Sequence, residues 1–294
     1  MIDRAQLIQV FLDTQKYYKD NVYLAAAVAN ARTRTKFYEA GEFPELVNPY
    51  VHQGELRLSK SRTFQAAMDL HKEFPDKKIA VLNFASATNP GGGVKHGSAA
   101  QEESLCRCST LFPAIDRRWL FEKYYNVNRA AGSDIYTDAI IYSPDIVICK
   151  TDEDIPQRLD REDFVSVDVI TCAAPNLYHL PEIYTNPQTG KKVRMKPEDL
   201  YKIHLQRTRH ILHIAAVNQV DILVLGAFGC GAFCNDPDTV APAMREAVED
   251  YRGLFDVIEF AIYCRDYETD NYKAFAQHIP EWEILFRDKN ATVQ

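Results

Sequence analysis

The sequence has little that would place it in a membrane, outside the cell or on bulk nucleic acid. None of its apolar runs approaches the roughly 18 residues that a membrane-spanning helix needs. The opening Met1-Ile2-Asp3-Arg4 lacks a basic region followed by an apolar stretch, which predicts no secretory signal. The net charge is −7, whereas proteins that bind DNA or RNA as their main partner are usually basic. Any nucleotide-like ligand must therefore be held by a local site.

Cysteine is present, but not in the pattern of a disulfide framework. The seven cysteines are an odd number and are scattered through apolar segments, which is typical of reduced thiols. Glycine and proline are close to their average usage, which excludes collagen-like and low-complexity chains. We expect a cytoplasmic protein, or a nuclear one if its source is eukaryotic, with a core large enough to need no disulfide or metal.

Apolar strands and amphipathic helices alternate along most of the chain. The first forty residues are predicted to form two helices, the first capped by Asp3 and the second beginning at about Val22. Buried strands are expected at Lys78–Ala85, Ile146–Cys149, Phe164–Cys172, Asp221–Leu225 and Phe255–Tyr263. Between them lie helices predicted at 61–72, 99–111, 197–219, after Asp236-Pro237 and after Asn271. This order predicts an α/β fold with a mostly parallel sheet.

The domain organisation follows from the same pattern. No internal repeat and no long linker divides the chain. We expect residues 1–50 to form an N-terminal helical extension packed on one structural core of residues 51–294. The polar stretch from 185 to 196 is predicted to be a surface hairpin or loop.

Two glycine-rich loops each follow a predicted strand. The first reads Asn89-Pro90-Gly91-Gly92-Gly93, and a backbone without Cβ atoms can approach a ligand closely or adopt positive φ. The second spans 226–233, and its successive amides near a helix start could bind phosphate. Its G-x-x-G-x-G spacing matches neither the dinucleotide-binding motif nor the P-loop. A plain turn is the alternative for each loop, but two such loops after strands favour a nucleotide or phosphate site at the strand ends.

An acidic pair begins the helix that follows the first loop. Gln101-Glu102-Glu103 comes seven residues after Gly93, and adjacent helical side chains diverge by about 100°, so the two acids must have different roles. Acids in a first turn also suit the helix macrodipole, which is the structural alternative. Beside a glycine triplet, however, one carboxyl is well placed to protonate the leaving oxygen of a bound sugar.

The triplet, the seven-residue spacer and the Gln-Glu-Glu together resemble the signature of poly(ADP-ribose) glycohydrolases, in particular the microbial type. The later Gly226-Ala-Phe-Gly-Cys-Gly-Ala-Phe233 is similar to the diphosphate loop of that family. The resemblance covers most of the chain from about residue 20 onward. It implies a three-layer α/β/α macrodomain with a mixed, mostly parallel sheet and an N-terminal helical extension.

The resemblance also implies roles for individual residues. Glu103 would be the general acid that protonates the leaving ribose oxygen, and Glu102 would bind a ribose hydroxyl of the leaving unit. The rest of the implied substrate site comprises Asn89, Gly91, Gly92, Gly93, Gln101, Gly229, Cys230, Gly231, Ala232 and Phe233. The first four of these would hold the distal ribose, Gly229 to Ala232 would offer amides to the diphosphate, and Phe233 would pack on the ribose. The transition state would be oxocarbenium-like, with no metal and no cofactor.

The implied activity is hydrolysis of ribose–ribose O-glycosidic bonds at the ends of poly(ADP-ribose), with ADP-ribose as product. ADP-ribosylated protein is the other implied partner, and neither a membrane nor sequence-specific nucleic acid is implied. A mono-ADP-ribosyl hydrolase and a non-catalytic ADP-ribose reader are the alternatives. The two acids argue against the reader, whereas a panel of substrates would separate the hydrolases.

Other reactive side chains are expected to have structural roles. Cys106 and Cys108 lie two apart on a predicted helix and point to nearly opposite faces, which opposes a zinc site with His96. Cys230 and Cys234 are predicted to be packed residues rather than catalytic thiols. Three histidines of the long helix are expected to be structural or exposed: His204, His210 and His213. The basic residues of the 185–196 loop are expected to be solvated: Lys191, Lys192, Arg194 and Lys196.

Overall fold

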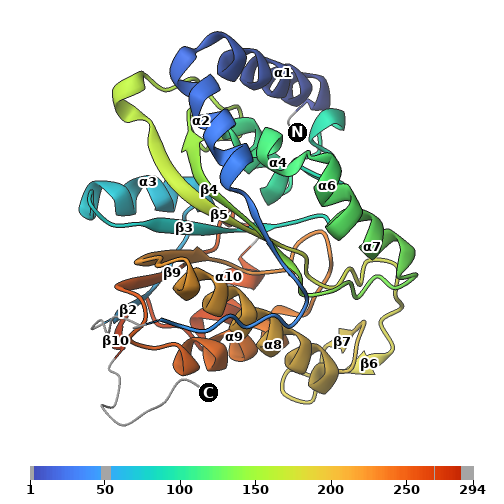
Figure 1. Ribbon diagram of the computed structural model, residues 1–294. Helices are drawn as coiled ribbons and strands as arrows, with labels where there is room; N and C mark the ends of the chain where they lie inside the picture. The colour runs from blue at the N-terminus through green and yellow to red at the C-terminus, as the bar shows by residue number, and fades with distance from the viewer. Residues whose placement is uncertain (1–2, 48–53, 268, 286–294) are drawn as a thin grey trace. The chain divides into compact units, whose positions relative to one another are not determined.

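The computed structural model describes residues 3–47, 54–267 and 269–285 (Figure 1). The chain divides into two compact units, one of Met1–Ala40 and Thr63–Ala173, the other of Gly41–Arg62 and Ala174–Gln294. The division into an extension of residues 1–50 and a core of residues 51–294 stays a prediction. Within the described residues, no helix combines the length and the apolar character needed to cross a membrane.

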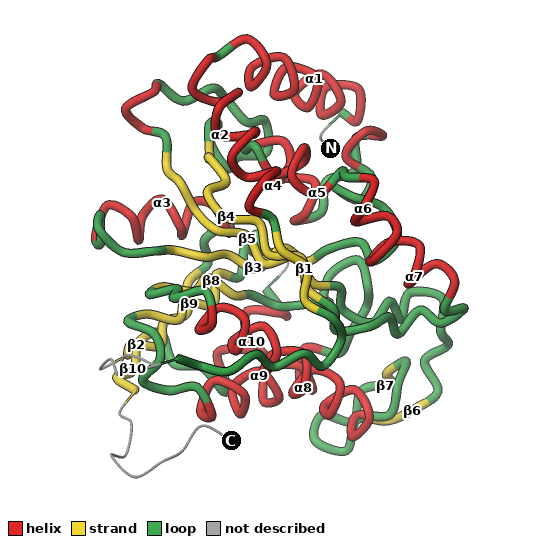
Figure 2. Tube along the Cα trace, viewed as in Figure 1, coloured by secondary structure: helices red, strands yellow, loops and turns green. Residues whose placement is uncertain are grey.

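The first unit is built on four adjacent strands in the order β1 (Lys36–Tyr38), β4 (Ile140–Ile148), β5 (Val165–Cys172) and β3 (Ile79–Phe84). β3 pairs in parallel with β5, whereas β4 is antiparallel to β5 and β1 is antiparallel to β4. Figure 2 shows β4, β5 and β3 as adjacent strands. Residues of β3 and β5 are buried almost throughout, because both faces of these strands are covered.

The two N-terminal helices pack within this unit. α1 (Arg4–Asp20) is capped as predicted, because the Asp3 carboxylate accepts a hydrogen bond from the Ala5 amide at 3.0 Å. α2 (Val22–Arg34) follows after a single residue. α1 lies beside α4 (Gln101–Cys108), and the Thr14 hydroxyl donates to the Arg107 carbonyl at 2.6 Å (Figure 1). The N-terminal helices thus support the helix that carries the acidic pair.

A chain of short helices fills the sequence between α4 and β4. The single helix expected over 99–111 is wrong, because Ser109 adopts extended backbone and ends α4 at Cys108. The helical elements of this unit beyond α1, α2 and α4 are α3 (Thr63–Glu73), the 3₁₀ turn η1 (Val94–His96), α5 (Leu111–Ile115), α6 (Arg118–Leu120), the π-helical turn η2 (Phe121–Tyr125), α7 (Asn126–Ala130) and the 3₁₀ turn η3 (Arg161–Asp163).

The second unit also has four adjacent strands. β8 (Ile222–Leu225), β9 (Val257–Ala261) and β2 (Gly54–Ser59) are parallel, and β10 (Trp282–Leu285) is antiparallel to β2. The helices are α8 (Pro197–Val217), α9 (Pro237–Asp250) and α10 (Asp270–Ala276), of which α8 and α9 pack together. The predicted surface hairpin is confirmed: β6 (Tyr184–Thr185) pairs with β7 (Lys192–Val193).

The expectation that Asn271 caps the last helix is wrong, because α10 begins at Asp270 and the N-cap position is Thr269. The sequence pattern also did not predict β2 and β10 here, nor β1 in the first unit. Together the strands and helices confirm the mixed α/β class.

Candidate active site

The first glycine loop connects β3 to α4, and the Gln101 side chain ties the two elements together. Its amide oxygen accepts from the Phe84 N–H at 2.9 Å. Its amide nitrogen donates to the Leu82 carbonyl at 2.7 Å and to the Thr63 hydroxyl at 3.1 Å. Both N–H donors of Gln101 therefore bind protein groups. This residue, predicted to contact substrate, has the geometry of one that positions the first turn of α4 at the end of β3.

The glycine triplet forms a tight turn against the acidic pair. The Gly92 amide donates to the Asn89 carbonyl at 3.0 Å, and Gly91 and Gly92 have φ values of +70° and +56°, which favour glycine. A Cβ built on Gly92 would overlap Oε1 of Glu103 and lie 3.1 Å from Oε2 of Glu102. The absence of a side chain at Gly92 thus allows the turn to lie directly on both carboxyls.

Glu102 is buried beneath this turn. Its Oε1 accepts from the Gly91 amide at 3.2 Å and from the Asn83 side-chain amide at 3.3 Å. Its Oε2 accepts from the Ser86 amide at 2.7 Å. The pKa of Glu102 is raised to about 8, mainly by burial and to a smaller extent by the nearby Glu103 carboxylate, although these hydrogen bonds, that from Ser86 above all, oppose the shift. At neutral pH this carboxyl is mostly protonated.

Glu103 has a different environment, as the divergence of adjacent helical residues requires. Its Oε1 accepts from the Gly93 amide at 2.8 Å. Its Oε2 is buried and has no hydrogen-bond partner within the described part of the chain. A buried carboxyl oxygen without a partner is costly, and such an atom is suited to a hydrogen bond that forms only with a ligand.

Asn89 lies at the exposed edge of the same loop. Its side-chain amide donates to the Thr88 hydroxyl at 3.1 Å, and its side-chain oxygen accepts from the Arg129 guanidinium at 3.1 Å. Sequence reasoning did not identify Arg129, which lies on α7, forty residues later in the chain. It also did not identify Asn83 and Ser86, because only the fold places them on the Glu102 carboxyl.

The second glycine loop follows β8 in the second unit and is organised by Asn235. The Asn235 side-chain amide donates to three carbonyls, those of Pro175 at 2.7 Å, Gly229 at 3.0 Å and Phe233 at 3.1 Å. Its side-chain oxygen lies 2.8 Å from Nε2 of His204, which is fully buried. Burial lowers the pKa of His204 to about 4, so the imidazole is neutral near pH 7.

The amides of this loop are arranged in two ways. The Cys230 N–H, one of four predicted to face a diphosphate, donates to the Ala227 carbonyl at 3.1 Å. The amides of Gly229, Gly231 and Ala232 donate to no protein group among the described residues, and Gly231 and Ala232 are exposed. Phe233 is half-buried beside them. The loop therefore presents unsatisfied donors to solvent, which is a feature of anion-binding turns.

The residues expected to be structural have that role. His204, His210 and His213 are buried, and the last two bind the carbonyls of Glu42 and Pro44 at 2.8 and 2.6 Å. Burial raises the pKa of the Cys106, Cys108 and Cys230 thiols, which disfavours reactive thiolates.

Two side chains of the basic run in the hairpin bind protein groups, whereas the sequence predicted a solvated run. Lys191 binds the Asp238 carboxylate at 2.7 Å, and Arg194 donates to the carbonyls of Tyr178 and Leu180 at 2.8 Å. A search of the described residues finds no group of three or more His, Cys, Asp or Glu side chains that could hold a metal ion. The expectation of a metal-free site stays a prediction.

Comparisons of the sequence and of the structure with known proteins identify the same family. A family model described as microbial-type PARG, catalytic domain, matches residues 5–151. The structure is similar to poly(ADP-ribose) glycohydrolase from Thermomonospora curvata bound to the inhibitor ADP-HPD, with TM-score 0.76 and 26% identity over 92% of this chain and 98% of that chain. It is also similar to poly(ADP-ribose) glycohydrolase from Deinococcus radiodurans in complex with ADP-ribose, with TM-score 0.71 and 33% identity over 85% and 96% of the two chains. A search of curated protein sequences gives no match. The structural similarities confirm the predicted fold class.

Proposed function

Because the chain belongs to the microbial-type poly(ADP-ribose) glycohydrolase family, we propose that its acidic pair and glycine loops cleave ribose–ribose bonds at the ends of poly(ADP-ribose). The protein is a glycosidase that hydrolyses poly(ADP-ribose) and binds ADP-ribose. ADP-ribosylated protein is the other partner that we propose. A cytoplasmic location remains a prediction.

We assign the proton transfer to Glu103. In the proposed reaction the bond between C1″ of the distal ribose and the leaving oxygen breaks, and Glu103 gives its proton to that oxygen. Water adds to C1″, and the proton that it loses returns to the Glu103 carboxylate. The observation that carries this assignment is the buried Oε2, which has no hydrogen-bond partner among the described residues, while Oε1 accepts from the Gly93 amide.

The neighbouring groups have supporting roles in the proposal. Glu102, protonated at neutral pH, can donate its own O–H to a ribose oxygen of the leaving unit. Asn89 and the triplet would hold the distal ribose, because a loop without Cβ atoms leaves room for a sugar ring. The exposed amides of Gly231 and Ala232 would bind diphosphate, and Phe233 would pack on a ribose.

The activity is tested by comparing two substrates of the protein and by measuring its binding of ADP-ribose. We expect release of ADP-ribose from automodified polymer, with much slower cleavage of mono-ADP-ribosylated protein. Equal rates on both would instead indicate a hydrolase without preference for the ribose–ribose bond. Binding of ADP-ribose with no hydrolysis of either substrate would contradict the assignment and indicate a reader.

A further inference from the structure

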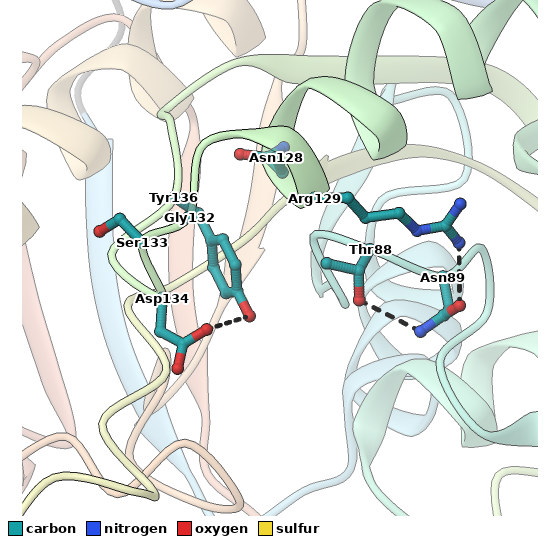
Figure 3. A pocket seen from close by; sticks show the side chains of 8 residues that line it. All are labelled: Thr88, Asn89, Asn128, Arg129, Gly132, Ser133, Asp134 and Tyr136. Carbon is teal, nitrogen blue, oxygen red and sulfur yellow. Dashed lines mark hydrogen bonds between the residues drawn. The ribbon is translucent and has the colours of Figure 1, made fainter.

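The first unit contains a hollow of about 370 Å³ beside Thr88 and Asn89, which come just before the glycine triplet in the sequence. This volume lies within the range of about 300–1,000 Å³ typical of small-molecule sites. Figure 3 shows the residues that line it: Thr88, Asn89, Asn128, Arg129, Gly132, Ser133, Asp134 and Tyr136. Thr88, Asn89 and Arg129 also belong to the first-loop site described above, and the other five do not.

The hollow is connected to the candidate active site through the first glycine loop. Thr88 and Asn89 belong to the loop that continues into the triplet, and they form one wall. The Arg129 guanidinium donates to the Asn89 side-chain oxygen at 3.1 Å, as Figure 3 shows. A ligand in the hollow would therefore touch the same asparagine that we place on the distal ribose.

The walls are held in place before any ligand arrives. Asn128 is buried; its side-chain oxygen accepts from the Thr137 amide at 3.1 Å, and its amide donates to the Tyr124 carbonyl at 3.1 Å. The Arg129 guanidinium is fixed by Asn89 and lies 5.6 Å from the centre of the Phe121 ring. Such preorganisation lowers the entropic cost of binding.

Tyr136 gives the hollow a strained aromatic wall. Its φ of +58° lies in the left-handed region, which is costly for a bulky residue. Its hydroxyl donates to the Asp134 carboxylate at 3.4 Å, and both side chains lie across the hollow from Arg129 in Figure 3. Backbone strain of this kind is often found where a side chain must be presented to a ligand.

The chemistry of the walls fits a nucleotide. A guanidinium suits a phosphate, a tyrosine ring suits stacking with a base, and a carboxylate suits the N–H groups of a base or a ribose hydroxyl. In the proposed reaction, the oxygen that Glu103 protonates belongs to the adenosine ribose of the leaving unit. We propose that this hollow, the leaving-unit pocket, binds the adenosine and adjacent phosphate of that unit. The inference rests on the proposed function.

The test compares two substrates that share the distal ADP-ribose but differ in the leaving group. One is the ADP-ribose dimer, and the other is ADP-ribose carrying a 4-nitrophenyl group at C1″, which cannot fill the leaving-unit pocket. The variants are Arg129→Gln and Tyr136→Asn, since asparagine tolerates left-handed backbone. We expect KM for the dimer to rise about tenfold in each variant, with kcat unchanged, because binding to an unreacting part of the substrate is lost uniformly.

Tyr136→Asn should cleave the nitrophenyl substrate within about twofold of the wild-type rate, because only the leaving-unit pocket is changed. Arg129→Gln also removes a hydrogen bond to Asn89, so its loss on the dimer should exceed its loss on the nitrophenyl substrate by about tenfold. Arg118→Gln, on an arginine whose side chain is 94% exposed and which does not line the hollow, is the matched control and should change neither KM. An equal loss on both substrates would mean that Arg129 or Tyr136 acts through Asn89, and no loss on the dimer would mean that the hollow is unused; either result overturns the inference. Cleavage of the nitrophenyl compound but not of the dimer by wild-type protein would instead remove the proposed function, and the inference with it.

Discussion

Replacement of Glu102 by glutamine should change how the stability of the protein depends on pH. The pKa of this carboxyl is about 8 in the folded protein, against 4.5 for an ordinary glutamate, and desolvation is the main cause. A raised pKa means that the folded state binds the proton more tightly than the unfolded state. The stabilisation is therefore complete below pH 4.5 and is lost as the pH rises toward 8.

The magnitude follows from the distance between the two pKa values. Between pH 4.5 and pH 8, ionisation of Glu102 should lower the free energy of unfolding by about 1.4 kcal/mol for each pH unit, and by about 5 kcal/mol in all. In Glu102→Gln the side chain cannot ionise, so this decrease of the free energy of unfolding with pH is absent. Its amide also places an N–H group opposite the Ser86 N–H, which now donates to Oε2 at 2.7 Å, and this should cost about 1–3 kcal/mol at every pH.

The assay is urea unfolding at pH 5, 6, 7 and 8, followed by circular dichroism. We expect the variant to be less stable than wild type at pH 5 and as stable or more stable at pH 8. Glu122→Gln is the control, because the Glu122 side chain is 63% exposed and its loss should leave the pH dependence unchanged. Parallel stability curves for wild type and Glu102→Gln would refute the assignment of a raised pKa to this residue.

Two further substitutions test the glycine loops. Gly92→Ala should lower the rate of ADP-ribose release at least about 100-fold, because its Cβ would displace Glu103 and a misplaced catalytic group can cost this much. Gly190→Ala is the control, since Gly190 also has positive φ but a Cβ there meets nothing within 4 Å, and an equal loss of activity in both would contradict the role of close packing. Asn235→Ala should weaken ADP-ribose binding in calorimetry about tenfold or more, because the loop loses three hydrogen bonds of about 1 kcal/mol each. Unchanged affinity would show that this loop does not hold the diphosphate.

The sequence predicted those features that depend on local chemistry. The Asp3 cap, the apolar strands and the long helix from Pro197 all follow from neighbouring residues, and each is present. The sequence also predicted a carboxyl beside the triplet, because only seven residues separate the loop from the helix start. The contact of Gly92 with both carboxyls depends on the conformation of the turn, which this spacing does not determine.

Features that depend on distant residues were not predictable in the same way. β1 is only three residues long and joins the sheet by pairing with β4, more than a hundred residues later. β2 alternates between buried and half-buried residues, so a weak signal for it was present in the sequence.

The same limit applies to the residues around the candidate site. Arg129 and Tyr136 line the same hollow as Thr88 and Asn89, and the packing of the short helices between α4 and β4 places them there. Asn235 and His204 meet across thirty-one positions. A motif locates the loop that binds a ligand, whereas the side chains that hold the loop in place come from the fold.

The proton transfer by Glu103 is the central claim, and one comparison tests it most directly. ADP-ribose release from automodified polymer is measured for wild type and Glu103→Gln, after titration calorimetry has shown that both bind ADP-ribose. The account predicts a rate lower by about 10²–10⁴-fold with affinity nearly unchanged, since glutamine keeps the shape of the side chain but has no acidic proton. A variant that binds ADP-ribose and releases it at the wild-type rate would contradict the account.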